Sequence, residues 1–309
     1  MSLLFPPRLQ VGDRVRVVLT SGPCNEAELL PGIEIWRSWG LEVDIDLPKH
    51  PAPLSYLAGN DGDRLHKLQS ALDDPACKAI LCGRGGYGVT RLLSELDWTD
   101  FRAQPKWIVG FSDITALLWA AARQGIASLH GPLVATLAAE SLDVQRDMWS
   151  WLTSGTGYEW TGSAWQSGSV TGTLLPANLA VATALIGTSD WPLPLPRVIL
   201  AWEDINEDAY RIDRLLTQWR HIGAFASVVG IALGRFTWSD PLPSEEIYDA
   251  TATLRDRLLD LGLPVVADLP FGHGIGDNRA LPVGAQATLD GNRGTLRVLS
   301  ASQTDAPLT

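Results

Sequence analysis

Short apolar runs typical of strands alternate with segments of helical periodicity through the first half of this chain. The expected strands span residues 14–19, 41–45, 79–82 and 108–111, and the expected helices span residues 26–39, 61–72, 90–96 and 115–123. Such alternation predicts a mainly parallel sheet with helices on both faces. Because ligands of such sheets bind at the carboxyl ends of the strands, functional residues are expected where an apolar run stops.

The second half of the chain contains both strands and helices. Gly, Ser and Thr dominate residues 154–169, which we interpret as a linker between domains at 1–153 and 170–309. Strands are expected at 198–202 and 228–233, helices at 209–219 and 244–261, and a hairpin near Asp290-Gly291. The N-terminal part is thus an α/β domain, and the C-terminal part mixes both element types.

One apolar run ends at a serine. The segment WIVGFSDIT, residues 107–115, predicts a strand, a sharp turn and a helix, with the Ser112 hydroxyl at the turn. A serine in such an elbow can attack a substrate, and the N–H of Asp113 points at the oxygen that becomes negative. The usual hydrolase elbow has a second glycine where this chain has Ile114. A helix cap after a buried strand is therefore the alternative interpretation of Ser112.

A glycine turn, GRGGYG at residues 83–88, follows the expected strand 79–82. Its glycines fit the dinucleotide pattern G-x-G-x-x-G, and Asp113 lies roughly where that pattern wants a ribose-binding acid. Its glycines also allow backbone N–H groups to approach a reacting oxygen closely, which would provide a second oxyanion donor. The alternative without a functional role is a tight turn between strand and helix. Such a turn is compatible with both the dinucleotide and the oxyanion interpretation.

A serine nucleophile needs a base, and the chain has five histidines. His273 lies between two glycines just after an apolar strand, where its side chain is exposed and its backbone unrestricted, so it is the preferred candidate. His130 follows a short strand and could line a site. Of the other three, His50 lies in a Pro-rich turn, and His66 and His221 lie at expected helical positions.

The acid that orients the base is expected at a strand end. Glu203 is the first charge after the apolar run 198–202, and strand alternation puts Asp204 on the opposite face. The alternative is that Glu203 is simply an exposed charge at the end of a strand or the start of a helix.

Charge and cysteine content exclude several classes of protein. The formal net charge is -11, which disfavours nucleic acid and anionic membrane surfaces as partners. We expect a cytoplasmic protein, because no signal peptide or long apolar span is evident. Three cysteines without C-x-x-C spacing, and the absence of H-E-x-x-H, predict neither a disulfide framework nor a metal site. The expected mechanism uses no metal or cofactor.

Six ordered blocks of the sequence resemble the LD-carboxypeptidase family of serine peptidases, which includes murein tetrapeptide carboxypeptidases and microcin C self-immunity peptidases. The blocks are Leu57-Ala58-Gly59 with Asp61 and Arg64, residues 79–88 with 91–93, residues 110–117, His130-Gly131-Pro132, residues 203–207 with 210–214, and Phe271-Gly272-His273. The likeness covers nearly the whole chain. It implies a β-rich α+β C-terminal domain, a site between the domains, and a homodimer.

The resemblance also implies roles for individual residues. Ser112 is the nucleophile, Glu203 the orienting acid and His273 the base, and the amides of Gly86 and Asp113 stabilise the oxyanion. The implied substrate is a small peptide, the murein tetrapeptide, cut between the L-centre of its diamino acid and the terminal D-alanine. Its terminal carboxylate needs a donor, for which Arg84, Arg211 and Arg279 are candidates. The other expected substrate-binding residues are Gly85 and Asn178.

One departure from the family pattern lies beside Asn178. Pro176-Ala177 replaces the usual glycine pair, which removes one backbone N–H.

Three alternatives to this function stay open. The first is cleavage of peptidyl or aminoacyl nucleotides, as in the microcin immunity branch, for which Trp160, Trp165 or Trp238 could stack on a base. The second is a nicotinamide or flavin enzyme built on the glycine turn. The third is a non-catalytic binder of cell-wall peptides.

Overall fold

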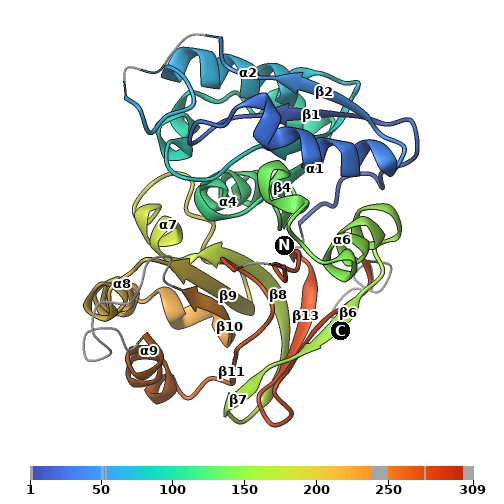
Figure 1. Ribbon diagram of the computed structural model, residues 1–309. Coiled ribbons are helices and arrows are strands. Elements are labelled where there is room, and N and C mark those ends of the chain that lie inside the picture. Colours follow the sequence, from blue (N-terminus) through green and yellow to red (C-terminus); the bar gives the residue numbers. More distant parts are fainter. Residues whose placement is uncertain (1–2, 50–51, 53, 238–249, 275, 302–309) are drawn as a thin grey trace.

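The computed structural model describes residues 3–49, 52, 54–237, 250–274 and 276–301, which form two sheets with helices around them (Figure 1). The first sheet has six strands in the order β12-β5-β4-β3-β1-β2. Its strands are β1 (Arg14–Val18), β2 (Glu42–Asp46), β3 (Cys77–Cys82), β4 (Trp107–Gly110), β5 (Ser128–His130) and β12 (Leu281–Val283). All pair in parallel except β12, which is antiparallel to β5. The predicted mainly parallel sheet is confirmed.

Helices cover both faces of this sheet. They are α1 (Glu26–Ser38), α2 (Asp61–Asp73), α3 (Thr99–Ala103), α4 (Thr115–Arg123), α5 (Val134–Leu137) and α6 (Leu142–Ser154). Within β3, Ile80 packs in the cluster that holds Leu68 of α2, whereas Leu81 packs with Ile33 of α1 on the other face. Because successive strand residues alternate between two buried faces, the strands are apolar throughout.

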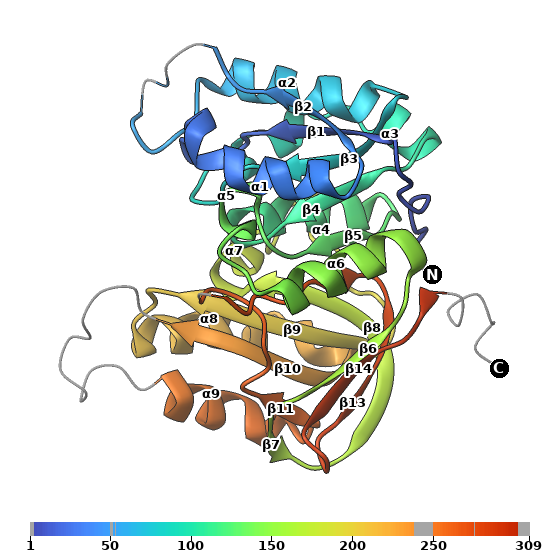
Figure 2. The same cartoon turned by 45° about the vertical axis from the view of Figure 1, so that its right-hand side comes forward.

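The second sheet has eight strands in the order β6-β14-β13-β8-β9-β10-β11-β7. They are β6 (Tyr158–Thr161), β7 (Ser163–Gln166), β8 (Ser169–Asn178), β9 (Val198–Ile205), β10 (Val228–Thr237), β11 (Val265–Ala267), β13 (Gln286–Asp290) and β14 (Thr295–Val298). The helices of this part are α7 (Leu179–Ala184), α8 (Ala209–His221) and α9 (Ala250–Leu258). The sheet is curved, and α8 and α9 lie along its outside (Figure 2). This strand-rich part agrees with the predicted fold class.

Two expected segments differ from the structure. Residues 154–169, expected as a linker, contain β6 and β7 at the two edges of the second sheet. Small residues there permit close backbone contacts, since a Cβ on Gly162 would lie 2.1 Å from the carbonyl oxygen of Ala267. The domain boundaries themselves stay predictions, and β12 crosses them by joining the first sheet.

Residues 90–96, expected as a helix, form two tight turns, η1 (Val89–Arg91) and η2 (Leu93–Glu95). The N–H of Leu92 bonds to the carbonyl of Val89, three residues back, rather than four. Three further short 3-10 turns are described, namely η3 (Ser112–Ile114), η4 (Ala224–Ser227) and η5 (Leu259–Leu261). Of the expected helix 244–261, residues 250–258 form α9, and 244–249 lie outside the described residues.

The two sheets meet at the ends of β4 and β8. The backbone N–H of Asn178 donates to Thr115 Oγ1 at 3.0 Å, and the Trp119 indole donates to the Pro176 carbonyl at 2.9 Å. These contacts place the residues that follow β4 beside those that follow β8 and β9.

Candidate active site

Ser112 begins η3, with only Phe111 between it and the end of β4, and has a backbone φ of 63°. This left-handed conformation costs a non-glycine residue about 1–2 kcal/mol, so the surrounding structure must hold it in place. A Cβ on Gly110 would lie 2.9 Å from Ile114 Cγ2, so only glycine fits under the turn. The predicted sharp turn between strand and helix is therefore present, and Ser112 is its strained residue.

His273 and Glu203 form a close pair. The distance between His273 Nδ1 and Glu203 Oε2 is 2.5 Å, and the backbone N–H of His273 donates to the same oxygen at 3.1 Å. The Glu203 side chain is fully buried, while 16% of the His273 side chain is exposed. Both contacts require Gly272, because a Cβ at that position would lie 2.4 Å from Glu203 Cβ.

Phe111 joins this pair to the serine turn. Its ring centroid lies 4.8 Å from that of His273, and Phe111 immediately precedes Ser112. Within the described residues, no hydrogen bond connects Ser112 Oγ to the imidazole. The structure thus brings the imidazole beside the residue next to the serine, and hydrogen bonds in sites of this type often tighten only when substrate is bound.

The Glu203–His273 pair favours its charged form. Burial opposes protonation of His273, but the Glu203 charge and hydrogen bond outweigh it and raise the pKa of the imidazole. Burial likewise opposes ionisation of Glu203, yet the charge of His273 and the hydrogen bonds from that residue hold the pKa of the Glu203 carboxyl below its usual range. The carboxylate can therefore orient the ring and stabilise an imidazolium.

Asp204 points to the opposite side of β9, as strand alternation predicts. It accepts hydrogen bonds from Asn178 Nδ2 and the backbone N–H of Ala180, both at 2.9 Å. Burial, together with the neighbouring Glu203 charge, raises the pKa of Asp204 to about 7. The Asn178 side chain also caps α7 by accepting from the Val181 N–H. Asn178 is thus buried and engaged by its own fold, rather than displayed on the surface.

The glycine turn lies against Ser112. A Cβ on Gly85 would be 3.1 Å from Ser112 Oγ, and the Gly85 carbonyl accepts from the N–H of Gly22 at 3.0 Å. Gly86 has a φ of 113°, which favours glycine. Among the described residues, the backbone N–H groups of Gly86 and Asp113 have no hydrogen-bond acceptor. Two backbone donors near the hydroxyl are thus available to a ligand.

The three candidate arginines differ in their partners. Arg84 is half exposed on the glycine turn, donates to the Pro23 carbonyl at 2.8 Å and lies 3.5 Å from Glu28. Arg211, on α8, pairs loosely with Glu207 and Asp208. Arg279 is bound by Asp147 and by Asp277. Arg84 is therefore the candidate on the same turn as Gly85 and Gly86.

The remaining histidines are placed as follows. His130 is fully buried between the rings of Phe111 and Phe271, and burial lowers its pKa to about 4. His66 lies in α2 and His221 ends α8. His50 lies outside the described residues. His130 is thus a neutral neighbour of the site.

Sequence reasoning assigned no role to the side chains of Ser21 or Arg64. Arg64 is a charged residue on the buried face of α2 that also holds Leu68 and Leu72, and it is fully buried. A charge within an apolar helical stripe is the signal that could have identified it.

Two kinds of feature are absent from the described part of the chain. No cluster of three or more His, Cys, Asp or Glu side chains suited to a metal ion occurs there. Likewise, none of the described helices has the length and apolar character needed to cross a bilayer.

Family models match both parts of the chain. The LD-carboxypeptidase N-terminal domain matches residues 15–131, and the LD-carboxypeptidase C-terminal domain matches residues 171–289. A Synechocystis protein predicted to be a carboxypeptidase is 48% identical, with 96% of this chain and 98% of the relative covered. The murein tetrapeptide carboxypeptidase of Pseudomonas aeruginosa is 34% identical, with coverages of 81% and 85%.

Solved structures show the same fold. Muramoyltetrapeptide carboxypeptidase from Oxalobacter formigenes has a TM-score of 0.82 and 30% identity, with 93% of this chain and 98% of that chain covered. The microcin C7 self-immunity protein MccF has a TM-score of 0.85 at 21% identity, with coverages of 96% and 98%. At that identity, the second likeness concerns the fold alone.

Proposed function

Because the chain belongs to the LD-carboxypeptidase family, we propose that it is a serine carboxypeptidase that removes the terminal D-alanine from murein tetrapeptides during cell-wall recycling. The bond it cuts joins the L-centre of the diamino acid to that D-alanine. The single observation that carries the assignment of residues is the 2.5 Å contact between His273 and Glu203 beside the strained Ser112 turn. Named relatives that act on murein tetrapeptides support the substrate class.

The reaction proceeds through an acyl-enzyme. Ser112 Oγ attacks the carbonyl carbon while His273 Nε2 accepts the hydroxyl proton, and Glu203 fixes the tautomer of the ring. The tetrahedral intermediate then loses the D-alanine amine, which takes the proton from His273. Water attacks the resulting ester, again with His273 as base, and Ser112 is regenerated.

Backbone donors stabilise the negative oxygen of each intermediate. The N–H groups of Gly86 and Asp113 supply this stabilisation, since neither has another acceptor within the described residues. Removing one such donor from a hydrolase typically costs about 10²–10³-fold in kcat.

Arg84 binds the terminal carboxylate of the substrate in this proposal. It lies next to Gly85 and Gly86, and its guanidinium is half exposed with one weak ionic partner, Glu28 at 3.5 Å. Arg279, in contrast, is committed to two aspartates. The homodimer, the cytoplasmic location and a substrate contact by Arg211 or Asn178 stay predictions.

The nucleotide-conjugate alternative needs an aromatic surface for a base. Trp160 is buried and stacks on Tyr158, and Trp165 is covered by the Arg255 guanidinium at 4.1 Å. Trp238 lies outside the described residues. Neither Trp160 nor Trp165 therefore favours cleavage of nucleotide conjugates.

The test is a direct comparison of substrates. The purified protein is incubated with murein tetrapeptide, with the matching pentapeptide and with an aminoacyl-sulfamoyl adenosine, and products are identified by mass spectrometry. We expect loss of one D-alanine from the tetrapeptide, and no such loss with Ser112→Ala. Cleavage of the adenosine conjugate alone would overturn the proposed substrate.

A further inference from the structure

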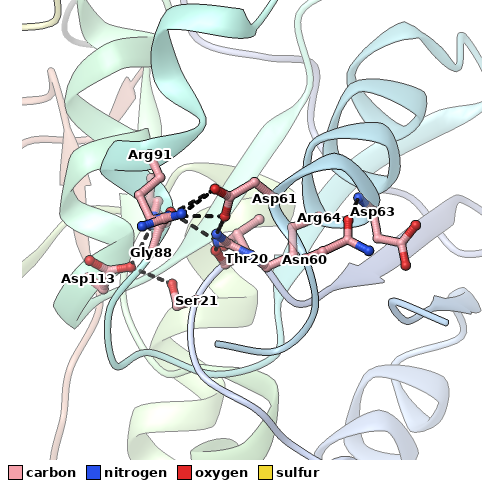
Figure 3. A network of polar contacts seen from close by, with 10 residues as sticks. Thr20, Ser21, Asn60, Asp61, Asp63, Arg64, Gly88, Arg91 and Asp113 are labelled. Atoms are coloured by element: carbon pink, nitrogen blue, oxygen red, sulfur yellow. Dashed lines mark hydrogen bonds and ion pairs between the residues drawn. The ribbon is translucent and has the colours of Figure 1, made fainter. Parts of the chain in front are cut away.

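The Asp113 carboxylate connects the serine turn to two other loops. It is almost fully buried, and its Oδ2 accepts a hydrogen bond from Ser21 Oγ at 2.6 Å (Figure 3). The same oxygen accepts a second hydrogen bond from the Val89 N–H at 3.0 Å. Ser21 follows β1, and Val89 follows the glycine turn. One side chain beside the nucleophile therefore contacts the segments after β1 and β3.

Arg64 contacts the same two segments from the other side. Its fully buried guanidinium donates to the Gly88 carbonyl at 2.9 Å and also to the Thr20 carbonyl. Asp61, one turn earlier in α2, pairs with Arg64 at 2.5 Å and also with the exposed Arg91 (Figure 3).

Asp113 and Arg64 thus hold opposite ends of one peptide group. The Gly88 carbonyl and the Val89 N–H belong to the same peptide bond, and Arg64 binds its oxygen while Asp113 binds its N–H. Arg64 and Asp113 also bind neighbouring groups after β1. Arg64 donates to the Thr20 carbonyl, and Asp113 accepts from the Ser21 hydroxyl. Burial raises the pKa of the Asp113 carboxyl, because a carboxylate removed from water is harder to ionise.

The clamped peptide ends the turn that carries Gly86. Gly88 has a φ of 138°, and a Cβ on Gly86 would lie 3.4 Å from the backbone of Gly22. Gly22 follows Ser21 and binds the Gly85 carbonyl, so fixing Ser21 and Val89 fixes both flanks of Gly86.

We propose that the Asp113 carboxylate and the Arg64 guanidinium are positioning residues that hold the Gly86 N–H in register with the Asp113 N–H, and so set the geometry of the oxyanion hole. The inference rests on the proposed function. In this arrangement Asp113 has two separate parts, a backbone N–H that meets the reacting oxygen and a side chain that aligns its partner donor.

Asp113→Ala separates these two parts, because it removes the carboxylate and keeps the N–H. We expect kcat for the tetrapeptide to fall about 10²-fold, as for loss of one oxyanion donor, with KM changed less than about threefold. A peptide aldehyde that forms a tetrahedral adduct with Ser112 should bind weaker by a similar factor. The tripeptide product should bind as it does to the wild type.

Three variants complete the set. Asp113→Asn keeps an oxygen for the Val89 N–H and should recover most of the lost kcat. Ser21→Ala removes one of the two groups that donate to the Asp113 carboxylate, and it should lower kcat only a few-fold. Arg91→Gln breaks the exposed outer pair with Asp61 but keeps the Arg91 backbone N–H that donates to the Gly88 carbonyl, so kcat should stay near that of the wild type.

Failure of this inference differs from failure of the proposed function. The rate at which a fluorophosphonate phosphonylates Ser112 depends on the same oxyanion donors and needs no peptide substrate, so it is measured on every variant. A drop for Asp113→Ala with recovery in Asp113→Asn supports the inference even if another peptide is the substrate. Unchanged labelling and kcat in Asp113→Ala, or equal losses of product and aldehyde binding, overturn it. If Asp113→Ala fails to fold, Ser21→Ala provides the test instead. A few-fold loss of kcat and of labelling rate in that variant supports the inference, and unchanged values overturn it.

Discussion

Glu203 Oε2 lies 2.5 Å from His273 Nδ1, although 70 positions separate the two residues in the chain. The carboxylate is fully buried and the imidazole is only slightly exposed. In the proposed mechanism the base must be neutral to accept the serine proton, so we expect this contact to set the pH at which activity appears.

Glu203→Gln is predicted to move the acidic limb of the pH–rate profile to lower pH. In the wild type the carboxylate raises the pKa of His273 above its usual value, so the acidic limb lies at higher pH than an isolated imidazole would give. Without the charge, burial dominates and lowers the pKa of the ring. The plateau should also fall by about 10³–10⁴-fold, because the wrong tautomer is favoured. The profile of kcat/KM against pH measures both effects, and a limb at an unchanged pH would argue against the pairing.

Gly272→Ala should displace Glu203 and abolish most activity. A Cβ there would lie 2.4 Å from Glu203 Cβ and 2.7 Å from Cγ, and the φ of 96° is strained for alanine. Overpacking of this kind costs about 1–3 kcal/mol of unfolding free energy.

Gly223→Ala is the matched control for backbone strain. Gly223 has a φ of 70° and nothing within 4 Å of the new Cβ. It should lose about 1 kcal/mol and keep normal kcat. Equal activities of the two variants in the tetrapeptide assay would contradict the role given to the Gly272–Glu203 contact.

Replacing Ser112 by glycine should stabilise the fold relative to alanine. Both variants lack the nucleophile, but only glycine adopts the φ of 63° without strain. The relief of about 1–2 kcal/mol is offset by the larger backbone entropy of glycine in the unfolded chain, which leaves a net gain of about 0.5–1 kcal/mol. Denaturant unfolding of both variants tests this, and greater stability of the alanine variant would show that the turn is not strained.

Arg84→Gln should weaken binding of substrates that end in a free carboxylate. Hydrogen bonds to charged groups contribute about 1.5–3 kcal/mol, so KM should rise about 10–100-fold while kcat changes less. A tetrapeptide with an amidated C-terminus provides the control, since it lacks the charge that Arg84 would bind. If KM rises equally for both peptides, another residue binds the carboxylate.

The strand–turn–helix around Ser112 and the opposite orientations of Glu203 and Asp204 could be predicted because local patterns determine them. Apolar runs mark the buried strands, and alternation along β9 decides which carboxylate faces His273. The sequence predicts a linker at 154–169 in place of β6 and β7, because the Gly, Ser and Thr residues around these two short edge strands have the composition of a loop. Their partners lie far away in sequence, and the residues alone give no register.

The clamp on the Gly88–Val89 peptide could not be predicted for a similar reason. Asp113 and Val89 are 24 positions apart, as are Arg64 and Gly88, and neither contact follows from strand or helix periodicity. The signal that the sequence does contain is a charged residue, Arg64, within the apolar stripe of α2. Long-range polar contacts of this type become visible once the order of β1, β3 and β4 in the sheet is known.

The most direct test of the account is the site and rate of labelling by a fluorophosphonate, mapped by peptide mass spectrometry. We expect a single phosphonylated residue, Ser112, no labelling in Ser112→Ala, and labelling slowed by at least about 10²-fold in His273→Ala. Labelling at another residue, or an unchanged rate without His273, would contradict the claim that these residues form one catalytic unit.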